Sequence, residues 1–173
     1  MKGDFVMHVF QPIPVDTLEF NPFEAIGKDW ALVSAGSKQK ANTMTVSWGG
    51  VGVLWGKNVA FIFVRDSRYT KEFIDNGDFF SISFLGKNHK EALNYCGSHS
   101  GRDVDKIAEA GLTWNYKHSI PFIDEGEFVL LCQKLSATKL TEDSFLSPDI
   151  KKWYADGDLH TMYIAEIIEA MAR

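Results

Sequence analysis

Residues 65–70, RDSRYT, place two arginines and two hydroxyl side chains directly before a predicted helix. The first backbone N–H groups of a helix lack an intrahelical partner, and the helix dipole favours negative charge beside them. Guanidinium and hydroxyl donors next to such amides are typical of a phosphate site. The candidate phosphate ligands are Arg65, Ser67, Arg68 and Thr70. A capped helix with solvated arginines is an equally compatible interpretation of the spacing.

Residues 41–48, ANTMTVSW, combine small polar side chains with a methionine and a tryptophan. The edge of such a strand could offer backbone hydrogen bonds and an apolar plate to a planar heterocycle. The alternative is a strand with one solvated face. The candidate residues are Asn42, Thr43, Met44, Thr45, Ser47 and Trp48.

The polar link between two predicted helices, residues 96–103, is the third candidate segment. With Lys106 after it, this link could close over a ligand and supply positive charge through Arg102 and Lys106. The candidate residues of this segment are Ser100, Arg102 and Lys106. It could equally be a helix–helix loop in which Ser100 is the N-cap.

Several other features carry weaker signals. His160, which opens the last predicted strand, could be an acid–base group or a ligand, or a structural histidine. Cys96 and Cys132 form no CxxC or Cys/His cluster, which argues against a zinc site or a thioredoxin-like motif, and the position of Cys96 on a predicted helix indicates a core residue. The glycine cluster 49–52 lacks the third small residue of a dinucleotide fingerprint, so we interpret it as a flexible turn joining two strands.

The composition is that of a globular protein. The 173 residues are 45% hydrophobic and 13% aromatic, with a net charge of −5, which argues against a general nucleic-acid binder. The length fits a single domain over residues 1–173. No apolar run approaches the length of a membrane span, and residues 1–5 contain no apolar signal-peptide region. We therefore expect a cytoplasmic protein without a membrane partner.

The elements that must position these residues are mostly strands. Proline-rich residues 1–25 predict an extended arm. Strands are predicted over 30–33, 43–48, 59–64, 79–85, 128–140 and 160–168, with 59–64 buried on both faces. Helices are predicted over 70–76 with Thr70 as N-cap, over 88–96 and 103–110, and in a tail at 168–173. The result is a mainly β fold with short helices, and a barrel or sandwich fits it better than a regular βαβ repeat.

The ordered set of these segments resembles the flavin reductase-like, FMN-binding split-barrel family, and within it the flavoredoxin-type proteins of anaerobic microbes. The segments are 41–49, 55–57, 64–70, 79–85 and 100–106, followed by His160, and the resemblance covers about residues 25–168. It implies a six-stranded antiparallel split β-barrel that forms a homodimer, with FMN bound near the dimer interface.

The resemblance also implies roles for individual residues. The strand from Asn42 to Ser47 would contact the isoalloxazine ring, largely through its backbone. Ser67, Arg68 and Thr70 would hold the 5′-phosphate, with Arg65 near and the 98–106 segment approaching the flavin. Trp48 and Trp55 are candidate plates or gates.

No side chain need act as an acid or base, because bound flavin would carry the redox chemistry. The resemblance thus implies an NAD(P)H-dependent flavin or FMN reductase. The alternative is a flavoredoxin-like electron carrier, which accepts electrons from a protein partner and has little nicotinamide activity.

Overall fold

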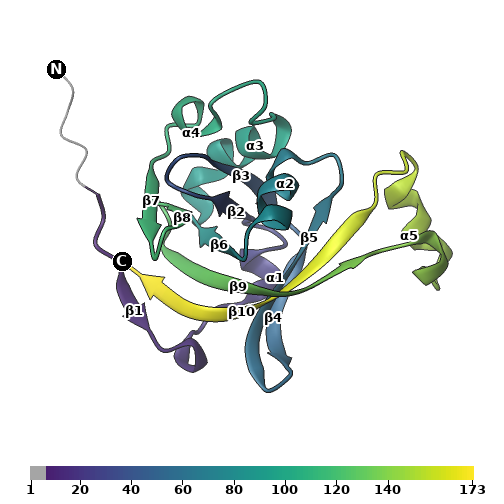
Figure 1. Cartoon of the computed structure of the whole chain (residues 1–173), viewed down its shortest axis with the longest axis horizontal. Coiled ribbons are helices and arrows are strands. Elements are labelled where there is room, and N and C mark those ends of the chain that lie inside the picture. The colour runs from purple at the N-terminus through teal and green to yellow at the C-terminus, as the bar shows by residue number, and fades with distance from the viewer. Residues whose placement is uncertain (1–6) are drawn as a thin grey trace.

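A computed structural model describes residues 7–173 and shows a mainly β fold built on one strongly curved antiparallel sheet (Figure 1). Its eight strands follow the order β3-β2-β6-β9-β10-β5-β4, and β1 pairs with β10. The strands are β1 (Gln11–Ile13), β2 (Ala31–Gly36), β3 (Ala41–Val46), β4 (Gly49–Leu54), β5 (Lys57–Arg65), β6 (Phe79–Phe84), β9 (Phe128–Lys139) and β10 (His160–Ala172). A separate hairpin pairs β7 (Trp114–Lys117) with β8 (Ile120–Ile123).

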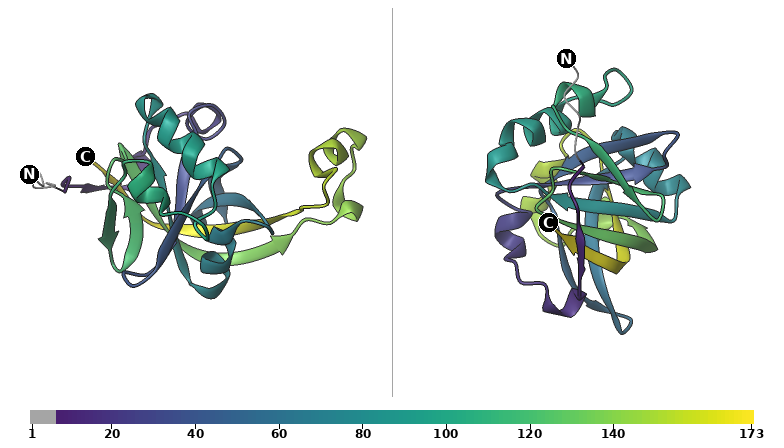
Figure 2. Two further views of the ribbon diagram at one scale, coloured as in Figure 1. Left: turned by 90° about the horizontal axis from the view of Figure 1, so that it is seen from above. Right: turned by 90° about the vertical axis from the view of Figure 1, so that its left-hand side faces the viewer.

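The helices are short and connect these strands. They are α1 (Pro22–Ala25), α2 (Tyr69–Asn76), α3 (Lys90–Ser98), α4 (Lys106–Glu109) and α5 (Pro148–Lys151). Single 3-10 turns lie at Val15–Thr17, Lys87–His89, Glu142–Ser144 and Lys152–Tyr154. Residues 140–159, which we call the β9–β10 loop, carry α5 and extend away from the rest of the molecule (Figure 2).

The core lies inside the curve of the sheet, because alternate residues of each strand point there. Val33, Ile62, Phe80, Leu130 and Tyr163 come from five different strands and form part of one buried cluster. A second cluster packs α3 against the other side of β2 through buried leucine and cysteine side chains. The helix α3 is thereby fixed against the strands that frame the candidate site.

Two predictions about the strands are wrong. The glycine cluster 49–52 is not a turn but most of β4, and the turn follows at Trp55 and Gly56, both with positive φ. Gly50 suits this strand because a Cβ there would lie 2.6 Å from the ring of Phe61 on the paired strand β5. The predicted helical tail 168–173 is the end of β10, which pairs on its two sides with β9 and β1.

The six-strand count is not confirmed, because β1 and β4 bring the main sheet to eight strands. The strand over 59–64 is fully buried on only one face, since Phe61 and Phe63 remain half-buried. Of the predicted arm over 1–25, residues 1–6 lie outside the described part, and the rest contains β1 and α1.

The helix boundaries also differ from the predictions. The residue that caps α2 is Arg68, without a side-chain cap bond, so Thr70 lies inside the helix. The predicted helix 103–110 is reduced to α4, and its cap is Asp105, whose carboxylate accepts from the N–H groups of Ile107 and Ala108. Ser100 therefore does not cap it.

Candidate functional site

β3, at one end of the curved sheet, contacts β5, the strand next to the other end. Because β3 ends the path of paired strands, its outer backbone edge has no sheet neighbour among residues 7–173. A cavity of about 270 Å³ lies along this junction, and we call it the seam cavity. Its lining comes from β3, β5, the residues after β3 and the β9–β10 loop: Met44, Thr45, Val46, Ser47, Trp48, Phe63, Arg65, Arg68, Trp153 and His160.

A second cavity of about 150 Å³ lies at the start of α2, and we call it the loop cavity. Its walls are the turn after β5, the end of α3 and the link after it. The lining residues are Met44, Ser67, Arg68, Tyr69, Thr70, Ser98, His99, Ser100 and Lys106. Met44 and Arg68 line both cavities, so the two spaces adjoin.

Arg68 is the cation at this junction. Its Nη1 donates to the Gly97 carbonyl at 2.7 Å, which fixes the guanidinium against the end of α3. A guanidinium has five N–H donors, so others remain for a ligand. Burial lowers the pKa of Arg68, but an arginine stays charged at neutral pH. The junction therefore presents a fixed positive charge to both cavities.

Lys106 adds a second cation to the loop cavity from α4. It is only 5% exposed, and its Nζ donates to the carbonyls of Thr43 at 2.9 Å and Cys96 at 2.8 Å. An ammonium has three donors, so one is not committed to these carbonyls. Burial lowers the pKa of Lys106 to about 8, and the nearby Arg68 charge contributes to the shift. A buried charge of this kind is stabilised by an anion beside it.

Arg65 and Ser67 have protein partners in this structure. Arg65 donates from Nη1 to the Asp158 carbonyl at 2.8 Å and from Nη2 to the Trp153 carbonyl at 2.9 Å. Ser67 donates to the carboxylate of Asp158 from its amide and its hydroxyl. Both residues thus hold the β9–β10 loop, a role that the sequence did not predict. Arg65 still lines the seam cavity and Ser67 the loop cavity.

Thr70 and Asn42 form a buried pair, in which Asn42 Nδ2 donates to Thr70 Oγ1 at 2.9 Å. This bond ties β3 to α2. Thr70 lines the loop cavity, whereas Asn42 and Thr43 line neither it nor the seam cavity. The Thr43 side chain is turned inward, where its hydroxyl donates to the Val33 carbonyl at 3.0 Å.

The substitution Thr70→Val is expected to lower the free energy of unfolding by about 1–3 kcal/mol, because it leaves the buried Asn42 amide without its acceptor. Urea unfolding followed by circular dichroism measures this loss. Thr138→Val, at an exposed position of β9, is the matched control and should cost less than about 0.5 kcal/mol. Equal stability of Thr70→Val and the wild type would show that the pair does not hold β3 to α2.

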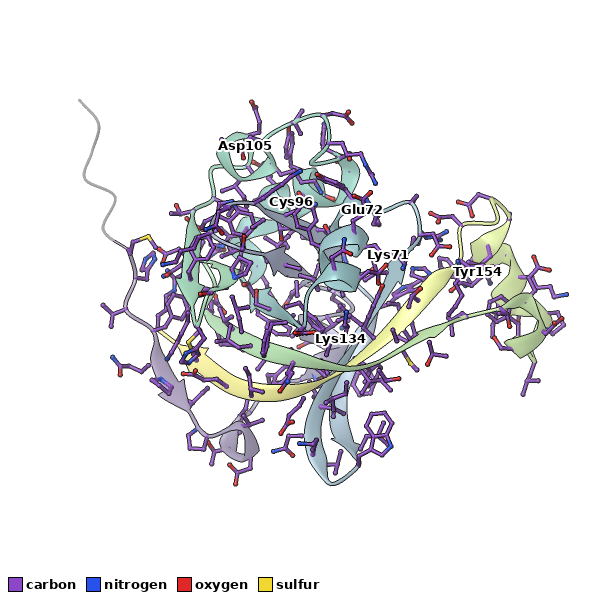
Figure 3. All side chains as sticks on the ribbon, viewed as in Figure 1. Lys71, Glu72, Cys96, Asp105, Lys134 and Tyr154 are labelled. Carbon is purple, nitrogen blue, oxygen red and sulfur yellow. The ribbon has the colours of Figure 1, made fainter. Side chains whose placement is uncertain are left out.

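Of the other polar candidates, Thr45 holds two elements together and Ser100 lines the loop cavity. The Thr45 hydroxyl donates to the Leu93 carbonyl at 2.5 Å and so fixes α3 on β3. Ser100 lines the loop cavity, and its hydroxyl accepts from the Arg102 amide at 3.2 Å. Arg102 lines neither cavity, because it pairs with Glu72 on α2 and lies over the Tyr69 ring, 4.5 Å from its centroid. Figure 3 labels Glu72 on α2 and Cys96 on α3.

Residues 23–173 match the flavin reductase like domain. The chain belongs to the flavin reductase-like family. A comparison with curated proteins found no match.

Solved structures agree with this family. A flavoredoxin from Methanosarcina acetivorans is 26% identical, with a TM-score of 0.65, covering 84% of this chain and 68% of that one. The FMN-binding domain of a flavin reductases-like enzyme from Shewanella baltica OS155 is 20% identical, with a TM-score of 0.68. The match covers 96% of this chain and 78% of that one. An NADH:FAD oxidoreductase from Streptomyces globisporus is 16% identical, with a TM-score of 0.61. The match covers 84% of this chain and 76% of that one.

In this flavin reductase-like chain, an aromatic group covers one side of the seam cavity. The Trp48 ring lies 4.9 Å from His160 and 5.4 Å from Trp153, measured between centroids. His160 Nδ1 lies 2.9 Å from the hydroxyl of Tyr154, which Figure 3 labels on the β9–β10 loop. Trp48 therefore lines the seam cavity, whereas Trp55 lies 60% exposed at the tip of the β4–β5 hairpin.

Trp153, like Phe63 on β5, lines the seam cavity but is not among the residues that the sequence predicted for the site. It stands in a polar stretch without strand or helix periodicity, and only the return of the β9–β10 loop brings it to Trp48. For His160, its neighbour on the cavity, the sequence allows an acid–base, a ligand or a structural role. Burial, and next the charge of Arg65, lower the pKa of His160 to about 4. The imidazole is therefore neutral at pH 7 and serves as an aromatic wall.

The depressed pKa of His160 makes a prediction about acid stability. The unfolded histidine titrates near 6.5 and the folded one near 4, so the unfolded state binds more protons in this interval. The free energy of unfolding is expected to fall by about 2–3 kcal/mol more between pH 6.5 and pH 4 in the wild type than in His160→Gln. Urea unfolding at a series of pH values measures both slopes. Parallel slopes would contradict the assigned pKa.

The cysteines are core residues, as predicted for Cys96. Both are free and fully buried. Burial raises the pKa of Cys96 to about 11 and raises that of Cys132 further above its ordinary value. Neither thiol is ionised at neutral pH, so neither is a ready nucleophile.

Residues 7–173 contain neither a candidate metal cluster nor a candidate membrane-spanning helix. No group of three or more His, Cys, Asp or Glu side chains in this part of the chain could hold a metal ion. Within the same residues, no helix has the length and hydropathy that a membrane crossing requires.

Proposed function

We propose that this chain binds FMN across the two adjoining cavities, with the phosphate in the loop cavity and the ring system in the seam cavity. The single observation that carries the proposal is the position of Arg68, which lines both spaces. A guanidinium there can bind the phosphate while it borders the ring pocket.

The donors in the loop cavity fit a phosphate. Arg68 and Lys106 supply two positive charges, and Ser100 brings a hydroxyl group from the α3–α4 link. The start of α2 borders the same space, and its dipole adds to the attraction. A phosphate monoester carries about −1.5 to −2 charges at pH 7, so these groups match it.

The seam cavity fits a planar ring in a different way. The free edge of β3 offers backbone donors and acceptors beside Met44 to Ser47, and Trp48 with His160 forms an aromatic wall. Trp153, held by the bond from Arg65 to its carbonyl, lines the cavity from the β9–β10 loop and would shield a bound ring from water. Flavin bound here would supply hydride acceptance and electron transfer. The protein residues would orient the ring and shield it, and the neutral His160 would not act as a proton donor at pH 7.

We propose that the activity is that of an NAD(P)H-dependent flavin or FMN reductase. The family supports this class, and the relative from Streptomyces globisporus is described as an NADH:FAD oxidoreductase. The alternative is an electron carrier that receives electrons from a protein donor. The flavoredoxin from Methanosarcina acetivorans favours it.

We further propose a homodimer. Val53, Leu54 and Trp55 at the tip of the β4–β5 hairpin are exposed apolar side chains, and a second copy could cover them. Sedimentation of the purified protein tests this directly, with a monomer at micromolar concentration as the contrary result.

The experiment that separates the two activities is an anaerobic spectrum of the FMN-loaded protein before and after addition of NADH or NADPH. Rapid bleaching of the flavin bands supports the reductase. Bands that persist with nicotinamide but disappear with dithionite support the carrier. A protein that shows no flavin bands after incubation with FMN would overturn both.

A further inference from the structure

The carboxylate of Asp158 occupies the donors of Ser67. The Ser67 amide donates to Oδ1 at 3.1 Å, and the Ser67 hydroxyl donates to Oδ2 at 2.5 Å. A carboxylate with one oxygen on an amide and the other on a hydroxyl uses the donors that a bound phosphate would use. Ser67 lines the loop cavity, so these donors lie at the edge of the phosphate pocket described above.

The position of Asp158 is fixed independently of this contact. Its carbonyl accepts from Arg65 at 2.8 Å, its amide donates to Asp156 Oδ1 at 3.1 Å, and the next carbonyl, of Leu159, accepts from the Asp66 amide at 3.2 Å. The β9–β10 loop therefore returns to the sheet with Asp158 held beside Ser67. The negative charge also lies close enough to Arg68 to favour its charged form.

Two consequences follow for an incoming phosphate. It meets a negative charge at the rim of its pocket, and it must share or displace the donors of Ser67. Both effects weaken the binding of a phosphorylated flavin and leave an uncharged flavin such as riboflavin unaffected.

We propose that Asp158 is a specificity-determining residue that competes with the ligand phosphate for Ser67 and so limits the preference of the site for FMN over riboflavin. This proposal rests on the proposed function. The carboxylate sets the upper limit of FMN affinity and keeps Ser67 satisfied in the flavin-free protein.

The test compares Asp158→Asn with the wild type for FMN and for riboflavin, by quenching of flavin fluorescence. The amide keeps the size of the side chain and can still accept from the Ser67 amide, but it removes the charge. We expect the Kd for FMN to fall about tenfold and that for riboflavin to change less than about twofold. Asp149→Asn, which removes an exposed charge from α5 on the same loop, is the control and should leave both values within about twofold.

A second measurement needs no variant. In the isotopically labelled wild type, the Ser67 amide resonance should move on addition of FMN and stay in place on addition of riboflavin, because only the phosphate competes for that amide. Equal movement with both ligands, no movement with FMN, or an unchanged FMN-to-riboflavin ratio in Asp158→Asn would overturn the role of Asp158. Failure of the wild type to bind either flavin is a different result, which overturns the proposed function and this inference with it.

Discussion

Replacing Arg68 by alanine is expected to raise the Kd for FMN about 100-fold, which corresponds to about 2.7 kcal/mol. The guanidinium lies at the junction of the two cavities, and charge-assisted bonds to a phosphate contribute about 1.5–3 kcal/mol each. Riboflavin lacks the phosphate, so its affinity should fall less than about fivefold. Titration of flavin fluorescence with both ligands measures the two effects.

Arg102→Ala is the matched control for this experiment. Arg102 lies in the link between α3 and α4. Its side chain pairs with Glu72 and lines neither cavity. The control should bind FMN within about threefold of the wild type. The assignment of Arg68 to the phosphate would be wrong if Arg68→Ala raised the Kd for FMN and the Kd for riboflavin by the same factor, with the unfolding curve of the variant unchanged.

Lys106→Met is expected to weaken FMN binding about tenfold at pH 7 and to remove most of its dependence on pH between 7 and 9. The wild-type lysine has a pKa lowered to about 8, so it is mainly charged at pH 7 and mainly neutral at pH 9. FMN affinity of the wild type should therefore fall as pH rises through 8, while the variant stays nearly flat. The affinity is measured at constant ionic strength, because the attraction is electrostatic.

The control for this second prediction is Lys71→Met, since Lys71 on α2 pairs with Asp75 and lines neither cavity. It should keep the wild-type dependence on pH. Circular dichroism of Lys106→Met checks that the carbonyls of Thr43 and Cys96 tolerate the loss of their donor. A wild-type affinity for FMN that is constant from pH 7 to 9 would contradict the assignment of Lys106 to the phosphate pocket.

Much of the fold could be predicted because its strands carry their own pattern. Residues 59–64, 79–85 and 128–140 are apolar or alternating, and a strand of the main sheet covers each of these ranges completely or except for its last residue. β4 was missed because its three glycines give no side-chain pattern, and it becomes a strand only through pairing with β5. The tail was missed for a similar reason, since β9 and β1 on either side of β10 override its helical composition.

The candidate site could be predicted in part. The segments around Met44, Arg68 and Ser100 do meet in space, because β3, the start of α2 and the link after α3 converge on the two adjoining cavities. The residue types of Arg65 and Ser67 could not predict that these side chains bind the β9–β10 loop. Their partners, Trp153 and Asp158, lie about 90 positions further along the chain, and only the course of the β9–β10 loop brings them together.

The measurement that tests the central claim most directly is an absorption titration of the purified wild-type protein with FMN, with riboflavin in parallel. The account predicts a saturable change in the flavin bands that ends at one FMN per chain, with weaker binding of riboflavin. Flavin spectra that stay unchanged in the presence of excess protein would contradict it, and the adjoining cavities would then need another occupant.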